Sequence, residues 1–172
     1  MKELTCPICG SEDFIFPIGP RNAAIMIIGD KPTDNDIKYG KPFTEGSGTI
    51  LRQEFAFRGI DTRQFRVTYL RSHISATKKL SPKCFEIDAL DVIKEAKNKK
   101  LIILISAEVV KYFTSQSVEN LMGLMTTSQL LSAPCFCMES LGSIFNRGGV
   151  VGEVRLSIQK ISEYIKKEGL VK

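Results

Sequence analysis

The first residues that suggest chemistry are two cysteines near the N-terminus. Cys6 and Cys9 are spaced as Cys-Pro-Ile-Cys-Gly, a turn in which two thiolates face one ion, as in zinc knuckles and iron–sulfur sites. The chain has five cysteines, an odd number. In an intracellular protein, unpaired thiols are metal ligands, core residues or reactive groups rather than disulfide partners. By itself the turn is half of a metal site.

A second group of polar residues lies in a segment rich in Gly, Pro, Asp and Asn, residues 29–48. It follows an apolar run, residues 23–28, and loops that leave the C-terminal end of a buried parallel strand are where α/β proteins bind ligands. The segment contains the carboxylates Asp30 and Asp36 and the aromatic ring of Phe43. From composition alone, the ring would be a core residue and the acids would be loop caps.

The hydrophobic pattern predicts the elements that position these residues. Apolar runs predict four buried strands, at residues 23–28, 65–70, 101–105 and 134–138. Helical spacing predicts helices at residues 49–58 and 85–97, and a last helix that stops at Gly169. This alternation predicts an α/β fold with three layers, α/β/α, around a central, mainly parallel four-stranded sheet. With no linker or repeat, residues 1–172 are expected to form a single domain.

Residues 29–51 resemble the first motif of the iron–sulfur-containing, family 4-like uracil-DNA glycosylases of bacteria and archaea. The family pattern is Gly-Glu-Ala-Pro-Gly-Ala-Asn-Glu, a short spacer, and Gly-Arg-Pro-Phe-Val-Gly-Arg-Ser-Gly-Gln-Leu-Leu; the chain reads GDKPTDNDIKYGKPFTEGSGTIL at the same spacing. The matching positions are Gly29, Pro32, Asn35, Gly40, Pro42, Phe43, Gly48 and Leu51. The resemblance implies that Phe43 stacks on a base flipped out of DNA, and that Asp30 or Asp36 orients a hydrolytic water.

The same resemblance completes the metal site. The family uses four cysteines, two near the N-terminus and two flanking the loop after the second strand. Where the family has Thr-Asn-Val-Val-Lys-Cys, residues 68–73 read Thr-Tyr-Leu-Arg-Ser-His, and a cysteine follows at position 84. The resemblance therefore implies one metal centre, an N-terminal turn at residues 6–9 completed by two later ligands, with the set Cys6, Cys9, His73 and Cys84.

A Cys3His set is common for structural zinc, although imidazole also ligates some iron–sulfur clusters. Zn²⁺ is favoured over a 4Fe-4S cluster, because replacing a thiolate by a neutral imidazole costs zinc little. The alternative for His73 is a solvent-exposed loop residue.

Two positions depart from the family pattern for reading uracil. Tyr69 stands where the family has an asparagine whose amide pairs with the base edge, and its bulk resembles a group that blocks the pocket. Cys137 stands where the family has the histidine that stabilises charge on the departing uracil. Cys135 and Cys137 alternate along a predicted strand, where cysteine also acts as a small hydrophobe. Losing one such donor costs about 100- to 1000-fold in rate, so uracil excision is expected to be weak or absent.

The net charge and the lengths of the apolar runs limit the possible partners and the location of the protein. A net charge of +5 is compatible with DNA as a partner, and equally with a role in solubility. Basic residues are concentrated within residues 52–83, where Arg71 and Lys78 are the expected DNA contacts. No run reaches membrane-spanning length and no signal-peptide core occurs, so the expectation is a cytoplasmic, intracellular protein without a membrane partner.

These observations predict a DNA-binding homologue of uracil-DNA glycosylase with weak or no uracil excision, acting in DNA repair or replication beside proteins of those processes. One alternative is an active glycosylase for a different damaged or modified base. Another is a metal-stabilised protein-interaction domain without a DNA function.

Overall fold

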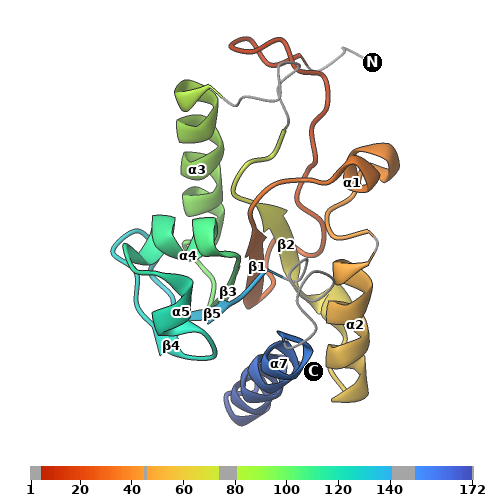
Figure 1. Ribbon diagram of the computed structural model, residues 1–172, viewed down its shortest axis with the longest axis vertical. Helices are drawn as coiled ribbons and strands as arrows, with labels where there is room; N and C mark the ends of the chain where they lie inside the picture. Colours follow the sequence, from red (N-terminus) through yellow and green to blue (C-terminus); the bar gives the residue numbers. More distant parts are fainter. Residues whose placement is uncertain (1–4, 45, 74–80, 141–149, 172) are drawn as a thin grey trace.

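The computed structural model describes residues 5–44, 46–73, 81–140 and 150–171, and it places the described strands in one sheet (Figure 1). The strands are β1 (Ile25–Gly29), β2 (Arg66–Tyr69), β3 (Leu101–Ile105), β4 (Met125–Thr126) and β5 (Cys135–Met138). Their order across the sheet is β2-β1-β3-β5-β4, and only β4 runs antiparallel to its neighbour.

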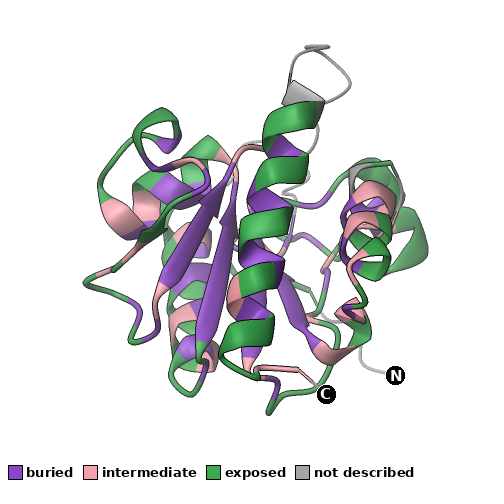
Figure 2. Ribbon diagram, turned by 90° about the horizontal axis from the view of Figure 1, so that it is seen from below, coloured by how far each residue is buried: buried purple, intermediate pink, exposed green. Residues whose placement is uncertain are grey.

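Helices cover both faces of the sheet, as Figure 1 shows. The described helices are α1 (Asp34–Tyr39), α2 (Ser47–Phe57), the 3-10 helix η1 (Thr62–Gln64), α3 (Pro82–Ala96), α4 (Ala107–Thr114), α5 (Val118–Leu121) and α7 (Val150–Lys167). Helices α2 and α7 pack on one face, and α3, α4 and α5 pack on the other. Figure 2 shows β1, β2, β3 and β5 buried throughout, with α7 lying over one face of the sheet.

The alternation of side chains along each strand divides the core in two. In β1, Ile25 and Ile27 face the cluster formed with α2 and α7, whereas Met26 and Ile28 face the cluster formed with α3, α4 and α5. Continuous apolar strands are required here because both faces of the sheet are covered. The predicted three-layer α/β fold is confirmed.

The predicted strand count needs one correction. The four predicted strands form and are mutually parallel, but β4 adds a fifth at the edge of the sheet. This strand has two residues, neither of them buried, so its backbone pairing with β5 leaves no hydrophobic pattern in the sequence.

Several helices also differ from expectation. Helix α1 forms inside the segment predicted to be an ordered surface loop, and α4 and α5 lie where no element was predicted. Helix α3 begins three residues before its predicted start, because the Ser81 hydroxyl accepts a hydrogen bond from the Cys84 N–H and Pro82 occupies the first turn.

The strand order brings the predicted site residues to one edge of the sheet. The chain passes from β1 to β2 on one side and then crosses to β3 on the other, so the C-terminal ends of these strands form the point at which α/β sheets bind ligands. Gly29 pairs with Tyr69 in the β1–β2 register, which places the loop after β1 beside the end of β2. Within the described residues, no helix combines the length and the apolar character that crossing a bilayer requires.

Candidate functional site

The rings of Phe43 and Tyr69 stack on one another at the C-terminal end of β1. Their centroids are 5.0 Å apart and their planes differ by 25°. Gly29 makes this contact possible, because a Cβ there would lie 2.6 Å from Cζ of Phe43 and 2.8 Å from Cε1 of Tyr69. The aromatic residue predicted to stack on a flipped base is thus stacked on a side chain of the protein itself.

The Tyr69 hydroxyl completes this contact with two hydrogen bonds. It donates to Oδ2 of Asp36 at 2.8 Å and accepts from the backbone N–H of Phe43 at 2.9 Å. Burial, and then the neighbouring carboxylate, raise the pKa of Tyr69 far above its ordinary value, so the hydroxyl keeps the proton that it donates. Tyr69 is only 4% exposed. Ring and hydroxyl together fix its position.

Asp36 is a buried carboxylate whose oxygens are fully used. It accepts hydrogen bonds from the N–H and hydroxyl of Thr33, from the N–H and hydroxyl of Thr44, and from the Tyr69 hydroxyl, all between 2.8 and 2.9 Å. A carboxylate has about four lone-pair positions, so these donors saturate it. Burial alone would raise the pKa of Asp36, but the hydrogen bonds from Thr44, Thr33 and Tyr69 outweigh burial and lower it.

Two further contacts fix the shape of the loop around Phe43, whose φ is 54°. The guanidinium group of Arg52 donates to the carbonyl oxygens of Phe43 and Thr44, at 2.5 and 3.1 Å. Gly48 lies so close that a Cβ there would be 1.9 Å from the Phe43 carbonyl oxygen. The loop that carries the predicted base-stacking residue is therefore held by α2.

The other predicted catalytic acid is engaged in an ion pair. Asp30 accepts from Nε of Arg71 at 2.9 Å and also from its Nη2. Both residues line a pocket of about 240 Å³ at the C-terminal edge of the sheet; its remaining walls are Leu70, Phe85, Glu108, Lys111 and Tyr112. The arginine predicted to contact DNA is thus paired with a predicted catalytic residue. Lys78, the other predicted DNA contact, lies outside the described residues.

Cys137 lies in the hydrophobic core. Its side chain belongs to the cluster under α3 and α4 and is 0% exposed, and Cys135 faces the same cluster. Burial raises the pKa of Cys137 to about 11, so the thiol is neutral at physiological pH. The structure places Cys137 on β5, beside β3, and buries it among apolar side chains, whereas Phe43 packs against the core cluster on the other face of the sheet.

The four predicted metal ligands lie together. One ligand atom from each of Cys6, Cys9, His73 and Cys84 lies within 4.8 Å of all the others, and Sγ of Cys6 is 3.7 Å from Sγ of Cys84. The two N-terminal cysteines sit in a turn closed by the hydrogen bond from the Gly10 N–H to the Cys6 carbonyl oxygen. His73 follows β2 and Cys84 lies in the first turn of α3. This cluster can hold a metal ion.

The chemistry of the cluster fits such an ion. Both ring nitrogens of His73 are buried and neither makes a hydrogen bond, which is costly unless another partner binds them. Burial, together with the neighbouring thiols of Cys6 and Cys84, raises the pKa of Cys9 to about 11. Thiols this close ionise together only beside a cation, and a coordinated metal supplies that charge.

A comparison with protein families identifies the family of the chain. The sequence model of the Uracil DNA glycosylase superfamily matches residues 16–154, which is more than half of the chain. The chain belongs to the uracil-DNA glycosylase superfamily. The match includes the loop after β1, the end of β2 and Cys137, whereas Cys6 and Cys9 precede it. A comparison with curated proteins finds no significant match.

Some functional residues of this superfamily member were not predicted from the sequence. Thr33, Thr44 and Arg52 hold the loop, and only Thr33 carried a signal, because Thr-x-x-Asp is the spacing of a helix capping box. Asp88, 3.2 Å from Nδ1 of His73, was also missed. Apart from the Thr33–Asp36 contact, these contacts join residues 8 to 15 positions apart and follow no local pattern.

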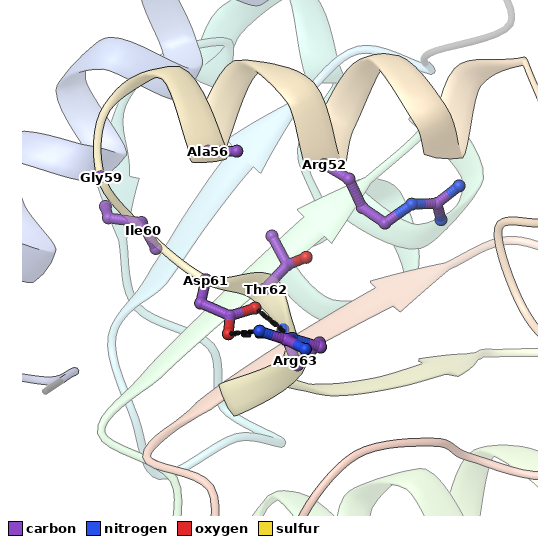
Figure 3. Close-up of a pocket in the computed structure, with 7 residues that line it drawn as sticks. All are labelled: Arg52, Ala56, Gly59, Ile60, Asp61, Thr62 and Arg63. Atoms are coloured by element: carbon purple, nitrogen blue, oxygen red, sulfur yellow. Dashed lines mark hydrogen bonds and ion pairs between the residues drawn. The ribbon is translucent and has the colours of Figure 1, made fainter.

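A larger pocket, of about 440 Å³, lies between α2 and η1 of this uracil-DNA glycosylase superfamily member (Figure 3). Its walls are Arg52, Ala56, Gly59, Ile60, Asp61, Thr62 and Arg63. The Arg63–Asp61 ion pair is exposed to solvent, and the guanidinium group of Arg52 points away from that pair toward the loop that it holds. Arg52 thus contributes mainly its stem to this pocket.

Proposed function

We propose that this superfamily member binds DNA and excises uracil slowly or not at all, acting inside the cell in DNA repair or replication with proteins of those processes as partners. The observation that carries the proposal is the contact of Tyr69 with Phe43 and Asp36. Membership of a superfamily that acts on DNA supports the choice of DNA as the partner.

A glycosylase must provide a flipped base with an aromatic face and with polar partners for its edge. Tyr69 already uses both the aromatic face and the polar partners that a flipped base would need. Its ring stacks on Phe43, and its hydroxyl is hydrogen-bonded to Asp36 and to the backbone N–H of Phe43. Burying the ring contributes about 2 kcal/mol and the hydrogen bonds about 1 kcal/mol more. A base that displaced Tyr69 would lose about two orders of magnitude in affinity.

The surrounding groups support slow chemistry as well. The neutral thiol of Cys137 is a weak hydrogen-bond donor, and a poor substitute for an imidazole that stabilises a departing anion. Asp36 has no free lone pair for a water, and Asp30 shares its charge with Arg71. Of the two acids, Asp30 is the one beside a pocket, and it remains our candidate for any residual catalysis.

Excision assays on DNA containing uracil, hypoxanthine, xanthine or 5-hydroxymethyluracil, run beside a DNA-binding titration, test the proposal. We expect DNA binding with little or no uracil release by the unmodified protein.

The double variant Tyr69→Asn with Cys137→His should release more uracil than the sum of the single variants, because groups that act on one transition state are non-additive. The control Tyr39→Asn alters an exposed tyrosine of α1 and should change nothing.

Rapid uracil release by the unmodified protein would contradict this proposal. Binding that is no tighter to DNA than to an uncharged polymer would instead favour a protein-interaction domain.

The pocket beside Asp30 favours one alternative, an active glycosylase for a different base. It offers about 240 Å³, two aromatic side chains and the carboxylates of Asp30 and Glu108 at the edge of the sheet. Release of hypoxanthine, xanthine or 5-hydroxymethyluracil in the assay, abolished by Asp30→Asn, would establish that activity.

We also propose that the metal is Zn²⁺, with a 4Fe-4S cluster as the alternative. Two thiolates on one tetrahedral zinc ion lie about 3.8 Å apart, given a Zn–S bond of about 2.3 Å. The Cys6–Cys84 separation of 3.7 Å matches that value. In a cluster each thiolate binds its own iron, so the sulfur atoms stand further apart. We expect about one zinc per chain by elemental analysis; iron with sulfide and visible absorbance would favour the cluster.

A further inference from the structure

Asp88 is a buried carboxylate beside the candidate metal centre. It lies on α3 four residues after Cys84, so the two side chains share one face of the helix. Its side chain is 8% exposed. Oδ2 accepts a hydrogen bond from the Ser72 N–H at 2.8 Å and Oδ1 accepts one from the Ser72 hydroxyl at 2.9 Å. Asp88 thus holds the residue that precedes the predicted ligand His73.

The same carboxylate lies next to the imidazole ring. Oδ2 of Asp88 is 3.2 Å from Nδ1 of His73, and both ring nitrogens lack an aligned hydrogen bond. The ring of Phe14 packs on the imidazole with a centroid distance of 4.8 Å. A ring nitrogen that carries a proton toward a carboxylate has no lone pair for a metal ion, which leaves Nε2 as the ligand atom.

We propose that Asp88 is a positioning residue of the metal centre, which accepts a hydrogen bond from Nδ1–H of His73 and thereby presents Nε2 to the metal. The proposal rests on the metal centre proposed above. A carboxylate in this place fixes the tautomer and the orientation of a ligating histidine and makes the ring a stronger ligand. Helix α3 then supplies both one ligand, Cys84, and the group that orients another.

This role also accounts for burying the charge of Asp88. An ionised carboxylate in the interior is costly unless it is paired and hydrogen-bonded. The Ser72 donors are neutral, whereas the N–H of a metal-bound imidazole carries part of the metal's positive charge and is a stronger donor. A thiolate at position 73, as in the resembling family pattern, would offer no proton and would repel the carboxylate.

The single histidine of the chain allows a direct test. In ¹⁵N NMR spectra of the metal-loaded protein as purified, we expect Nε2 to carry the metal-bound signal and Nδ1 to carry a slowly exchanging proton. In Asp88→Asn that proton should exchange faster. A metal-bound Nδ1, or a proton on Nδ1 whose exchange ignores Asp88→Asn, overturns the proposal.

Metal affinity provides the second test, by competition with a zinc chelator. Asp88→Asn should weaken zinc binding by about 10- to 100-fold. The matched control Asp91→Asn, an exposed position on the same helix that pairs with Lys94, should not weaken it. In the His73→Cys background, Asp88→Asn should cause no loss, because a thiolate has no N–H to donate.

The pair of backgrounds separates this role from a purely structural one. An equal loss in both backgrounds would mean that Asp88 acts only by holding Ser72, and no loss with His73 present would mean that it does not act on the metal; either result overturns the proposal. If His73→Cys does not fold, the NMR result decides. A protein that binds no metal at all would remove the metal centre itself, a failure that elemental analysis detects before any Asp88 variant is made.

Discussion

Ser106 has the least favourable backbone of the residues around the sheet edge. It joins β3 to α4 with φ 106° and ψ 155°, a region that side chains rarely adopt. Such strain costs about 1–3 kcal/mol and concentrates at functional sites. Its hydroxyl accepts a long hydrogen bond, 3.4 Å, from the Val109 N–H, a cap that glycine replaces at a cost of a few tenths of a kcal/mol.

We therefore expect Ser106→Gly to raise the free energy of unfolding by about 1 kcal/mol, measured by urea denaturation. Ser115→Gly, at a milder φ of 58°, is the comparison and should gain less. A less stable Ser106→Gly protein would mean that the cap outweighs the strain.

Asp36 should make the stability of the fold depend on pH. The unfolded pKa is about 4 and the folded pKa is lower, so the stabilisation is present above about pH 4 and is lost as pH falls through the folded value. Asp36→Asn should lower the free energy of unfolding by about 2 kcal/mol at neutral pH, and the difference should shrink in acid. The exposed neighbour Asp34, changed to Asn, serves as the control. A difference that stayed constant down to pH 2 would show that the ionised form is not what the loop requires.

At the scale of elements, the contact between the Phe43 loop and α2 depends on one glycine. Gly48→Ala places a Cβ against the Phe43 carbonyl oxygen, which must then move. We expect a loss of about 2 kcal/mol in thermal or chemical unfolding. Gly152→Ala, in α7 with open space around its Cβ, should instead stabilise the protein by about 0.8 kcal/mol. Equal effects of the two changes would contradict the predicted crowding at Gly48.

The sequence predicted those elements whose pattern is set by burial. Strands β1 and β3 are continuous apolar runs because both of their faces are covered, and α7 shows its buried stripe in the spacing of Val154, Ile158 and Ile161. Helix α1 was missed because it has six residues in a segment of loop-like composition, where its capping box is the main signal.

The candidate site also contains some residues that the sequence predicted and some contacts that it did not. The candidate metal ligands could be predicted because the resemblance to a known family implies them, and the structure brings all four together. The hydrogen bond from Tyr69 to Asp36 was not predictable, because it joins residues 33 positions apart and depends on the orientation of a ring that packs against Phe43 and Gly29.

At the scale of the whole molecule, a net charge of +5 has a measurable consequence if the partner is DNA. Affinity should fall steeply with salt and depend little on DNA sequence, because phosphate contacts release counterions. Arg71→Gln should weaken binding to every duplex equally, although its pairing with Asp30 reduces the effect. Arg63→Gln, at the exposed pair beside η1, is the control. Binding that ignored salt would argue against a phosphate interface.

The distance along the chain between the two halves of the proposed metal centre should affect how the protein is made. Cys84 follows Cys6 by 78 positions. At about 5–20 residues per second, the first pair of thiols waits roughly 4–16 s on the ribosome for its partners. Throughout that interval the two thiols alone can hold a metal ion only weakly, and a cellular oxidant can convert them to a disulfide. The yield of correctly folded protein should therefore depend on a reducing environment during translation, before the sheet exists to bring α3 to the N-terminal turn.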